Sequence, residues 1–187
     1  THNRITTKGV IPFAPSFDVV GWFASDPKIC EQVGAVLLDE PTTTFDFKRL
    51  ILAIDAFALV NNSVNETLNP KIQALVDQFQ QTKELKVSPD GLDTWFEIFR
   101  TVQGSEIWAN RKQWIKEVRP KFGPGIHERL EWASSLDSNT ISSARNRHIE
   151  IKQYLTNFLG PNEIICLPTS PRVAPLRGTE TDKLEVE

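Results

Sequence analysis

Two short apolar runs constrain the fold of this chain more than any other feature of its sequence. They are Leu50–Ile54 (LILAI) and Ile164–Leu167 (IICL). A short apolar run bounded by charged residues or proline is typical of a strand that is buried on both faces of a sheet. A more polar segment, Glu84–Val87, is a third strand candidate. Because segments with helical spacing separate these runs, the sequence predicts an α/β chain with a mixed or parallel sheet flanked by helices.

Apolar residues recur at helical spacing in much of the remaining chain and predict a series of helices. The helices are expected at residues 26–38, 69–80, 91–118, 126–136 and 138–159. Ser25-Asp26-Pro27 and Asn69-Pro70 each place a capping side chain ahead of proline and so mark helix starts. In the longest helix the apolar face also carries a charged residue, Glu106. The prolines and glycines of residues 119–125 predict a loop.

The composition is ordinary for a globular protein and argues against two classes of partner. The chain has 187 residues, 40% of them hydrophobic and 24% charged, which is enough for one domain with a core. Its net charge of −3 offers no basic field for phosphate backbones, so no nucleic-acid partner is expected. No apolar run is long enough to cross a bilayer, and no signal peptide is visible, so no membrane partner is expected. A cytoplasmic location is the default expectation.

The two ends of the sequence differ from those of a complete globular chain. There is no methionine, even at the first position. A translated chain normally begins with methionine, so a truncated or processed product is expected. After Pro171 the apolar rhythm is lost, and residues 177–187 are expected to form a disordered tail.

The residues that could bind metals or cofactors are scattered along the chain. His2, His127 and His148 show no metal-ligand spacing, so no metal is expected. No glycine-rich phosphate loop is present, so no nucleotide cofactor is expected. Cys30 and Cys166 lie in apolar surroundings and are expected to be buried thiols.

Ser16 and Ser170 each lie beside proline and are the serines considered as nucleophiles. A nucleophilic serine needs a base within reach and donors for the oxyanion. Neither serine has a recognisable partner in the sequence, so each hydroxyl is expected to bond the backbone of a turn. Residue chemistry alone thus predicts an α/β domain without an active site.

One block of the sequence, Gly9–Pro27 (GVIPFAPSFDVVGWFASDP) with the residues before it, resembles a stretch of the amidase signature family. The matching positions are Thr1, Arg4, Gly9, Pro12, Ser16, Asp18, Gly21 and Ala24. The block departs from the family pattern at Asn3, where glycine is usual, and at Ser25, where arginine is usual. Trp22-Phe23 resembles the plant-type amidases that act on indole-acetamide-like substrates.

Two further blocks follow in the family's order. Trp114–Ile126 (WIKEVRPKFGPGI) is similar to a family segment with tryptophan at its start and FGP near its end. Ile164–Pro171 (IICLPTSP) is similar to the apolar strand that ends in P-T-x-P. The resemblance implies that residues 1–176 are part of an amidase-signature fold, with a mixed central sheet flanked by helices that is incomplete in this chain. An incomplete sheet implies exposed edges and apolar surface, so the isolated chain is expected to aggregate or to be partly molten.

The resemblance also implies an activity. Family members hydrolyse a small carboxamide to acid and ammonia with a lysine, a serine in a cis peptide and a serine nucleophile. All of these precede the segment that matches Thr1, so no catalytic residue is expected in this chain and no turnover from it alone. A small amide substrate is the expected partner, and homodimer formation stays open.

By the same resemblance, the helical middle of the chain, residues 91–136, covers the substrate channel. The expected wall residues of the substrate pocket are Phe13, Phe99, Gln103 and Trp108, with plain core packing as the alternative for each. Two other functions stay open: a non-catalytic binding module similar to the amidase-type chloroplast import receptor, and the amide-transferring subunit of a tRNA-dependent amidotransferase.

Overall fold

The computed structural model describes residues 4–39 and 46–179, which form two compact units. The first unit comprises residues 1–44 and 100–145, and the second comprises residues 45–99 and 146–187. Most of the tail predicted at 177–187 lies outside the described residues. In the part of the chain that the structure describes, no helix has the length and apolar character needed to cross a bilayer.

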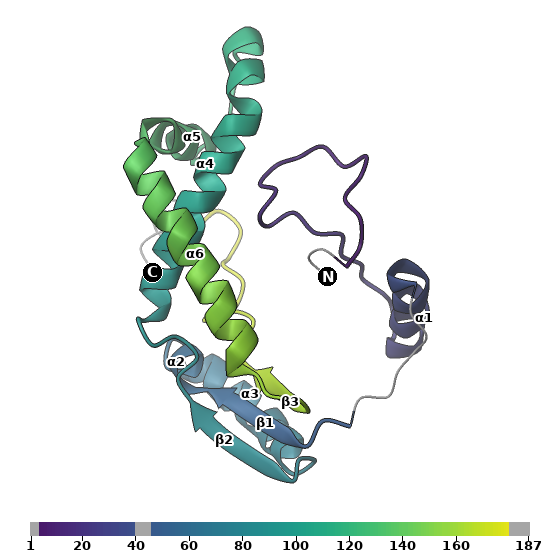
Figure 1. Cartoon of the computed structure of the whole chain (residues 1–187). Coiled ribbons are helices and arrows are strands. Elements are labelled where there is room, and N and C mark those ends of the chain that lie inside the picture. Colours follow the sequence, from purple (N-terminus) through teal and green to yellow (C-terminus); the bar gives the residue numbers. More distant parts are fainter. Residues whose placement is uncertain (1–3, 40–45, 180–187) are drawn as a thin grey trace. The chain divides into compact units, whose positions relative to one another are not determined.

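The second unit is built on a three-stranded parallel sheet with strand order β2-β1-β3 (Figure 1). Its strands are β1 (Arg49–Ala53), β2 (Gln81–Leu85) and β3 (Glu163–Cys166). Leu50 is opposite Thr82 on one side and Ile164 on the other. Leu50 and Ile51 are almost completely buried. The two predicted apolar strands are confirmed, and every described strand pair is parallel.

The polar strand β2 begins earlier in the sequence than expected. The sequence predicts a strand from Glu84 to Val87, whereas β2 covers Gln81–Leu85. Its side chains are mostly exposed because β2 lies at one edge of the described sheet and pairs only with β1. An exposed edge strand lacks the continuous apolar run that identifies a buried strand, so its bounds are poorly marked in the sequence.

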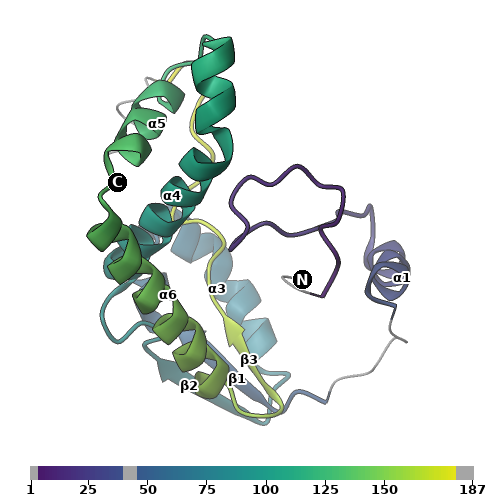
Figure 2. The same cartoon turned by 45° about the horizontal axis from the view of Figure 1, so that its top comes forward.

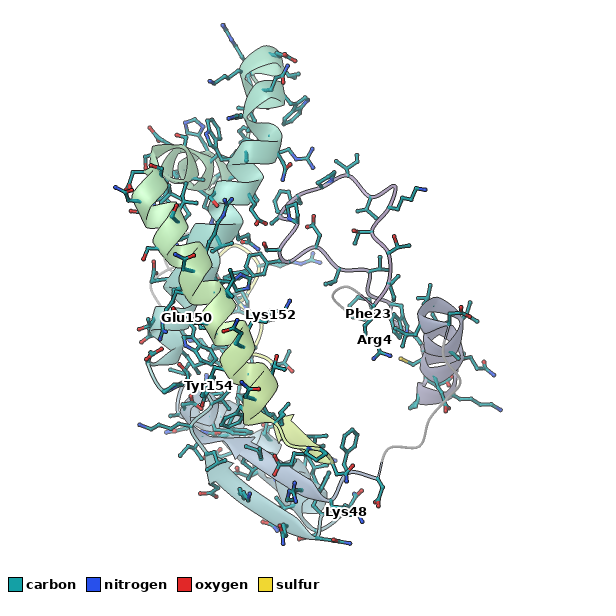
Figure 3. The ribbon with its side chains drawn as sticks, in the orientation of Figure 1. Arg4, Phe23, Lys48, Glu150, Lys152 and Tyr154 are labelled. Atoms are coloured by element: carbon teal, nitrogen blue, oxygen red, sulfur yellow. The ribbon has the colours of Figure 1, made fainter. Side chains whose placement is uncertain are left out.

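Helices flank this sheet. The short helix α2 (Ile54–Phe57) follows β1, and α3 (Asn62–Val76) connects it to β2. In Figures 1 and 2, α3 lies behind the sheet and the end of α6 (Ser138–Phe158) lies in front of it. Tyr154 lies on α6 (Figure 3). Its ring is edge-on to Trp95, with 6.1 Å between ring centroids. This aromatic pair joins α6 to the start of α4 (Leu92–Val118) within the second unit.

The start of α3 was predicted incorrectly. Asn69-Pro70 was expected to open this helix, but the helix begins seven residues earlier and contains Pro70 in its interior. The Asn61 side chain caps it by accepting a 3.0 Å hydrogen bond from the Val64 amide. Proline removes one backbone hydrogen bond from a helix interior, but the helix continues on either side of it.

The other predicted helices lie close to their expected positions, whereas the short helix α2 was not predicted. In α1 (Pro27–Leu38) the Asp26 carboxylate accepts from the Ile29 amide at 2.9 Å, which satisfies a free donor at the helix start. The helix ends at Asp39, whose φ of 50° is left-handed. The Asp137 carboxylate caps α6 in the same way, by accepting from the amides of Asn139 and Thr140. Local capping chemistry therefore set these boundaries.

In the first unit, α4 packs closely against α5 (Ile126–Ser135). Gly104 on α4 faces Trp132 on α5, and a Cβ atom at this position would lie 2.7 Å from Cζ3 of the indole. The Arg100 guanidinium lies over the same indole, 4.5 Å from the ring centroid. The neighbouring Val102 and Ala133 are buried. The small residue at 104 thus permits the close approach of the two helices.

Candidate functional site

The structure places the four expected wall residues in both units. Phe13, Gln103 and Trp108 belong to the first unit, and Phe99 belongs to the second. Gln103 and Trp108 are half-buried on α4, whereas Phe13 is 50% exposed. Two open surface hollows, one on α6 around Ile151 and one on α1 around Val36, include none of the four. Their assignment to a substrate pocket stays a prediction.

A polar cluster of the first unit holds the segment Pro12–Asp18, here called the anchored loop, onto α4. Its central contact joins Ser16 to Glu106. The Ser16 hydroxyl donates to Oε1 of Glu106 at 2.6 Å, and the Ser16 amide donates to Oε2 at 2.9 Å. One carboxylate therefore accepts both donors of a single residue, and both side chains are half-buried.

Two more residues of α4 bind the backbone of the anchored loop. Asn110 Nδ2 donates to the Phe13 carbonyl at 3.2 Å and to the Glu106 carbonyl at 3.0 Å. Arg111 Nη2 donates to the Pro12 carbonyl at 2.8 Å. The loop is thus attached to two successive turns of α4 by side chains that differ in charge.

The anchored loop is also closed internally by Asp18. The Asp18 carboxylate accepts the Phe13 amide through Oδ2 at 2.9 Å and the Ala14 amide through Oδ1 at 3.0 Å. The Ala14 carbonyl in turn accepts the amides of Phe17 and Asp18. Ala14 is 1% exposed. Phe13 therefore has a fixed backbone and a half-exposed ring.

The prediction for the hydrogen-bond partner of Ser16 was wrong. Its hydroxyl was expected to bond the backbone of a turn, but it bonds the carboxylate of a residue 90 positions later. Ser170 follows the prediction, since its hydroxyl donates to the Arg172 carbonyl at 2.9 Å. A carboxylate that already accepts two hydrogen bonds from Ser16 orients the loop, and it resembles an anchor more than the base of a nucleophile. The signal for Glu106 was its position on an apolar helix face, where a charge requires a partner.

No metal centre forms among the residues that the structure describes, because nowhere in them do three potential ligands cluster. His127 and His148 lie on separate helices, and His2 lies outside the described residues. Cys30 is exposed on α1, which corrects the expectation that it is buried. It lies in a helix with a single buried residue, Gly34. Cys166 on β3 is half-buried, and this burial raises the pKa of its thiol.

A second carboxylate lies at the carboxyl end of the parallel sheet. Asp55, just after β1, accepts the amides of Val87 at 3.0 Å and Ser88 at 2.8 Å. Burial opposes ionisation of Asp55, but these hydrogen bonds outweigh it and lower the pKa of the carboxyl group. The bonds tie the chain after β2 to the end of β1, which is a structural role.

Comparison with known proteins relates the chain to amidases over nearly its whole length, although no family model matches it. Amidase 1 of Arabidopsis thaliana is 29% identical over 205 residues, which cover 94% of this chain and 48% of that protein. Outer envelope protein 64, chloroplastic, also from Arabidopsis thaliana, is 26% identical, and the match covers 35% of that protein. The chain thus spans about half the length of the first relative.

A solved structure shows the same fold. The structure described as "Crystal structure of amidase" superposes with a TM-score of 0.82 at 19% sequence identity. The superposition covers 95% of this chain and 41% of that one. The parallel sheet with its flanking helices is therefore part of a larger fold in that protein.

Proposed function

The chain corresponds to part of an amidase-signature protein, and from this premise we propose that the protein containing it hydrolyses a small carboxamide to a carboxylic acid and ammonia. The similarity to Amidase 1, which extends over 94% of the chain, carries this proposal. The shared fold supports it, because the structural neighbour is itself an amidase by description.

In this proposal the residues that break the amide bond lie outside these 187 residues. A serine would attack the amide carbonyl and pass its proton through a second serine, held by a cis peptide bond, to a lysine. Backbone amides would stabilise the oxyanion, and the leaving amine would take up a proton and depart as ammonia. Water would then release the acid from the acyl-enzyme. The present chain contributes the surrounding shell of the active site.

The surface of the first unit is consistent with that arrangement. The extended segment before α1 carries large apolar side chains that are strongly exposed, including Ile11 at 72% and Phe23 at 103% (Figure 3). A protein surface rarely leaves such side chains uncovered in one segment unless they face another protein surface. The proposal assigns this segment to the contact with the catalytic part of the same protein.

The substrate in this proposal is a small amide with an apolar group. Phe13, Gln103, Trp108 and Phe99 are its expected wall residues. Trp22-Phe23, which resembles the plant-type amidases, favours an indole-acetamide-like compound as the first substrate to test. A cytoplasmic location also belongs to the proposal, and the relatives include a protein named for the chloroplast outer envelope.

A second candidate is a non-catalytic binding module with an amidase fold. The 26% identity to Outer envelope protein 64 over 96% of this chain favours it, because that name describes a place in the cell instead of a reaction. The two candidates differ in whether the polypeptide before Thr1 carries the serine nucleophile, the second serine and the lysine.

The deciding experiment expresses the full coding sequence that contains this segment and measures ammonia release from indole-acetamide and a simple aryl amide. Turnover that is lost when the serine nucleophile is replaced by alanine would support the amidase. A natural substitution at the nucleophile together with no turnover would favour the binding module. The isolated 187-residue chain is the matched control and is expected to release no ammonia.

A further inference from the structure

We infer that Glu106 is a positioning residue that fixes the anchored loop, Pro12–Asp18, and thereby holds Phe13 as one wall of the amide-binding pocket. This inference rests on the proposed function, since it assigns a wall to that pocket. It goes beyond the family resemblance in naming the residue on which the wall depends.

Glu106 joins the loop to α4 through its carboxylate, next to the contacts that Asn110 and Arg111 make with the loop backbone. Both of its carboxylate oxygens accept from Ser16, at 2.6 Å from the hydroxyl and 2.9 Å from the amide. Hydrogen bonds to an ionised acceptor are about twice as strong as neutral ones. Two of them to one residue also fix its orientation. Loss of the carboxylate would leave the half-buried amide of Ser16 without its acceptor.

The remaining contacts pass this fixed geometry to Phe13. Its amide donates to Asp18 at 2.9 Å and its carbonyl accepts from Asn110 at 3.2 Å, so both backbone groups have partners. Ser16 lies between Phe13 and Asp18 in the loop, and Asn110 lies one turn after Glu106 on α4. The helix therefore binds the Phe13 carbonyl directly through Asn110. The Phe13 amide is held by Asp18, which belongs to the same loop as the Ser16 that Glu106 binds.

The ring of Phe13 is left half-exposed although its backbone is held at both ends. An aromatic ring on a fixed backbone suits a binding wall, because little side-chain freedom is lost when a ligand packs on it. Ala14 beside it is buried, whereas Phe13 is not. The arrangement thus presents an apolar face for the organic group of an amide.

The test compares Glu106→Ala with Glu117→Ala in the full-length protein. Glu117 is a matched control because it lies on the same helix and contacts Gln113, not the loop. Glu106→Ala is expected to raise KM for indole-acetamide about tenfold, with kcat within about twofold, because the wall binds substrate and transition state alike. The control is expected to change neither constant.

Hydrogen exchange of the peptide that covers residues 12–18 gives an independent readout. Exchange is expected to accelerate in Glu106→Ala and to stay unchanged in Glu117→Ala. Ser16→Ala removes the hydroxyl bond but keeps the amide bond, and it is expected to raise KM about threefold. This milder variant carries the test if Glu106→Ala does not fold.

The outcomes separate this inference from the proposed function. A wild-type protein without turnover refutes the proposed function, and the assignment of Phe13 to a pocket wall is then refuted as well. Turnover in the wild type with an unchanged KM in Glu106→Ala and Ser16→Ala refutes the role of Phe13 as a pocket wall and leaves the proposed function standing. Unchanged exchange of residues 12–18 in Glu106→Ala refutes the positioning role of Glu106 itself.

Discussion

Gly104 on α4 and Trp132 on α5 approach so closely that a Cβ atom at Gly104 would lie 2.7 Å from the indole. The indole is a rigid ring that cannot easily move away from such an atom, because the Arg100 guanidinium also lies over it, 4.5 Å from its centroid. The pair therefore fixes how α5 packs on α4 within the first unit.

Gly104→Ala is expected to destabilise the protein by about 1 kcal/mol. Overpacking of a tight contact costs about 1–3 kcal/mol. The better helix propensity of alanine offsets up to about 1 kcal/mol of this cost. Equilibrium urea unfolding followed by tryptophan fluorescence measures the net change. Gly123→Ala is the control, since a Cβ atom there meets nothing within 4 Å. If Gly104→Ala were more stable than the wild type, the claim that Trp132 leaves no room for a Cβ atom at position 104 would be contradicted.

The pair Arg49–Glu163 predicts how the stability of the second unit depends on pH. Glu163 accepts from the Gly160 amide at 2.8 Å and from Arg49 Nε at 2.7 Å. These two contacts, the first more than the second, lower the pKa of the Glu163 carboxyl group. Ionised Glu163 therefore stabilises the folded chain at neutral pH. This stabilisation decreases as the pH falls from the ordinary glutamate pKa of about 4.3 through the lower folded value.

Glu163→Gln is expected to lower the urea midpoint at pH 7, and its difference from the wild type is expected to shrink as the solution is acidified below about pH 4. Urea titrations at several pH values measure this difference. Glu128→Gln, at an exposed position of α5, is the control and is expected to show a smaller difference at pH 7. A difference that grows on acidification would be the wrong sign for a lowered pKa.

The two cysteines are expected to differ in reactivity. Cys30 is exposed, whereas Cys166 is half-buried and the pKa of its thiol is raised by burial. The thiolate is the reactive form, so Cys166 has both less thiolate and less access to reagent. Alkylation by iodoacetamide at pH 8, followed by mass spectrometry, is expected to modify Cys30 about tenfold faster. Equal rates would show that the end of β3 opens readily.

Local signals in the sequence predicted most of the fold. The apolar runs identified β1 and β3 because buried parallel strands must be apolar on both faces. Ser25-Asp26-Pro27 marked the start of α1, where the Asp26 carboxylate accepts a free amide. Asn61 carries the same signal for α3, but Pro70 gave a competing one that proved wrong.

Contacts between distant residues could not be predicted in this way. Ser16 and Glu106 are 90 positions apart, and their pairing depends on how the anchored loop returns to α4. The sequence showed only that Glu106 interrupts an apolar face. The exposure of Cys30 likewise depends on which face of α1 is covered, which helical spacing alone does not determine.

The neighbours Trp22 and Phe23 give the last prediction, because they have opposite environments. Trp22 donates to the Cys30 carbonyl at 3.1 Å and packs against Gly34, whereas Phe23 is fully exposed. If Phe23 belongs to a surface that normally contacts other protein, the isolated chain should self-associate through it. Phe23→Ser is then expected to weaken self-association at least about tenfold, the equivalent of one exposed aromatic contact.

Sedimentation velocity across a concentration series measures this change, and circular dichroism reports the helix content. Phe23→Ser is expected to leave the helix content unchanged, since Phe23 packs against nothing that α1 needs. Trp22→Ser is the comparison and is expected to lower it, because α1 loses both the indole hydrogen bond and the contact at Gly34. Self-association that is unaffected by Phe23→Ser would show that the chains do not associate through this segment. The contact with the catalytic part, which the proposed function assigns to this segment, would then have to lie elsewhere.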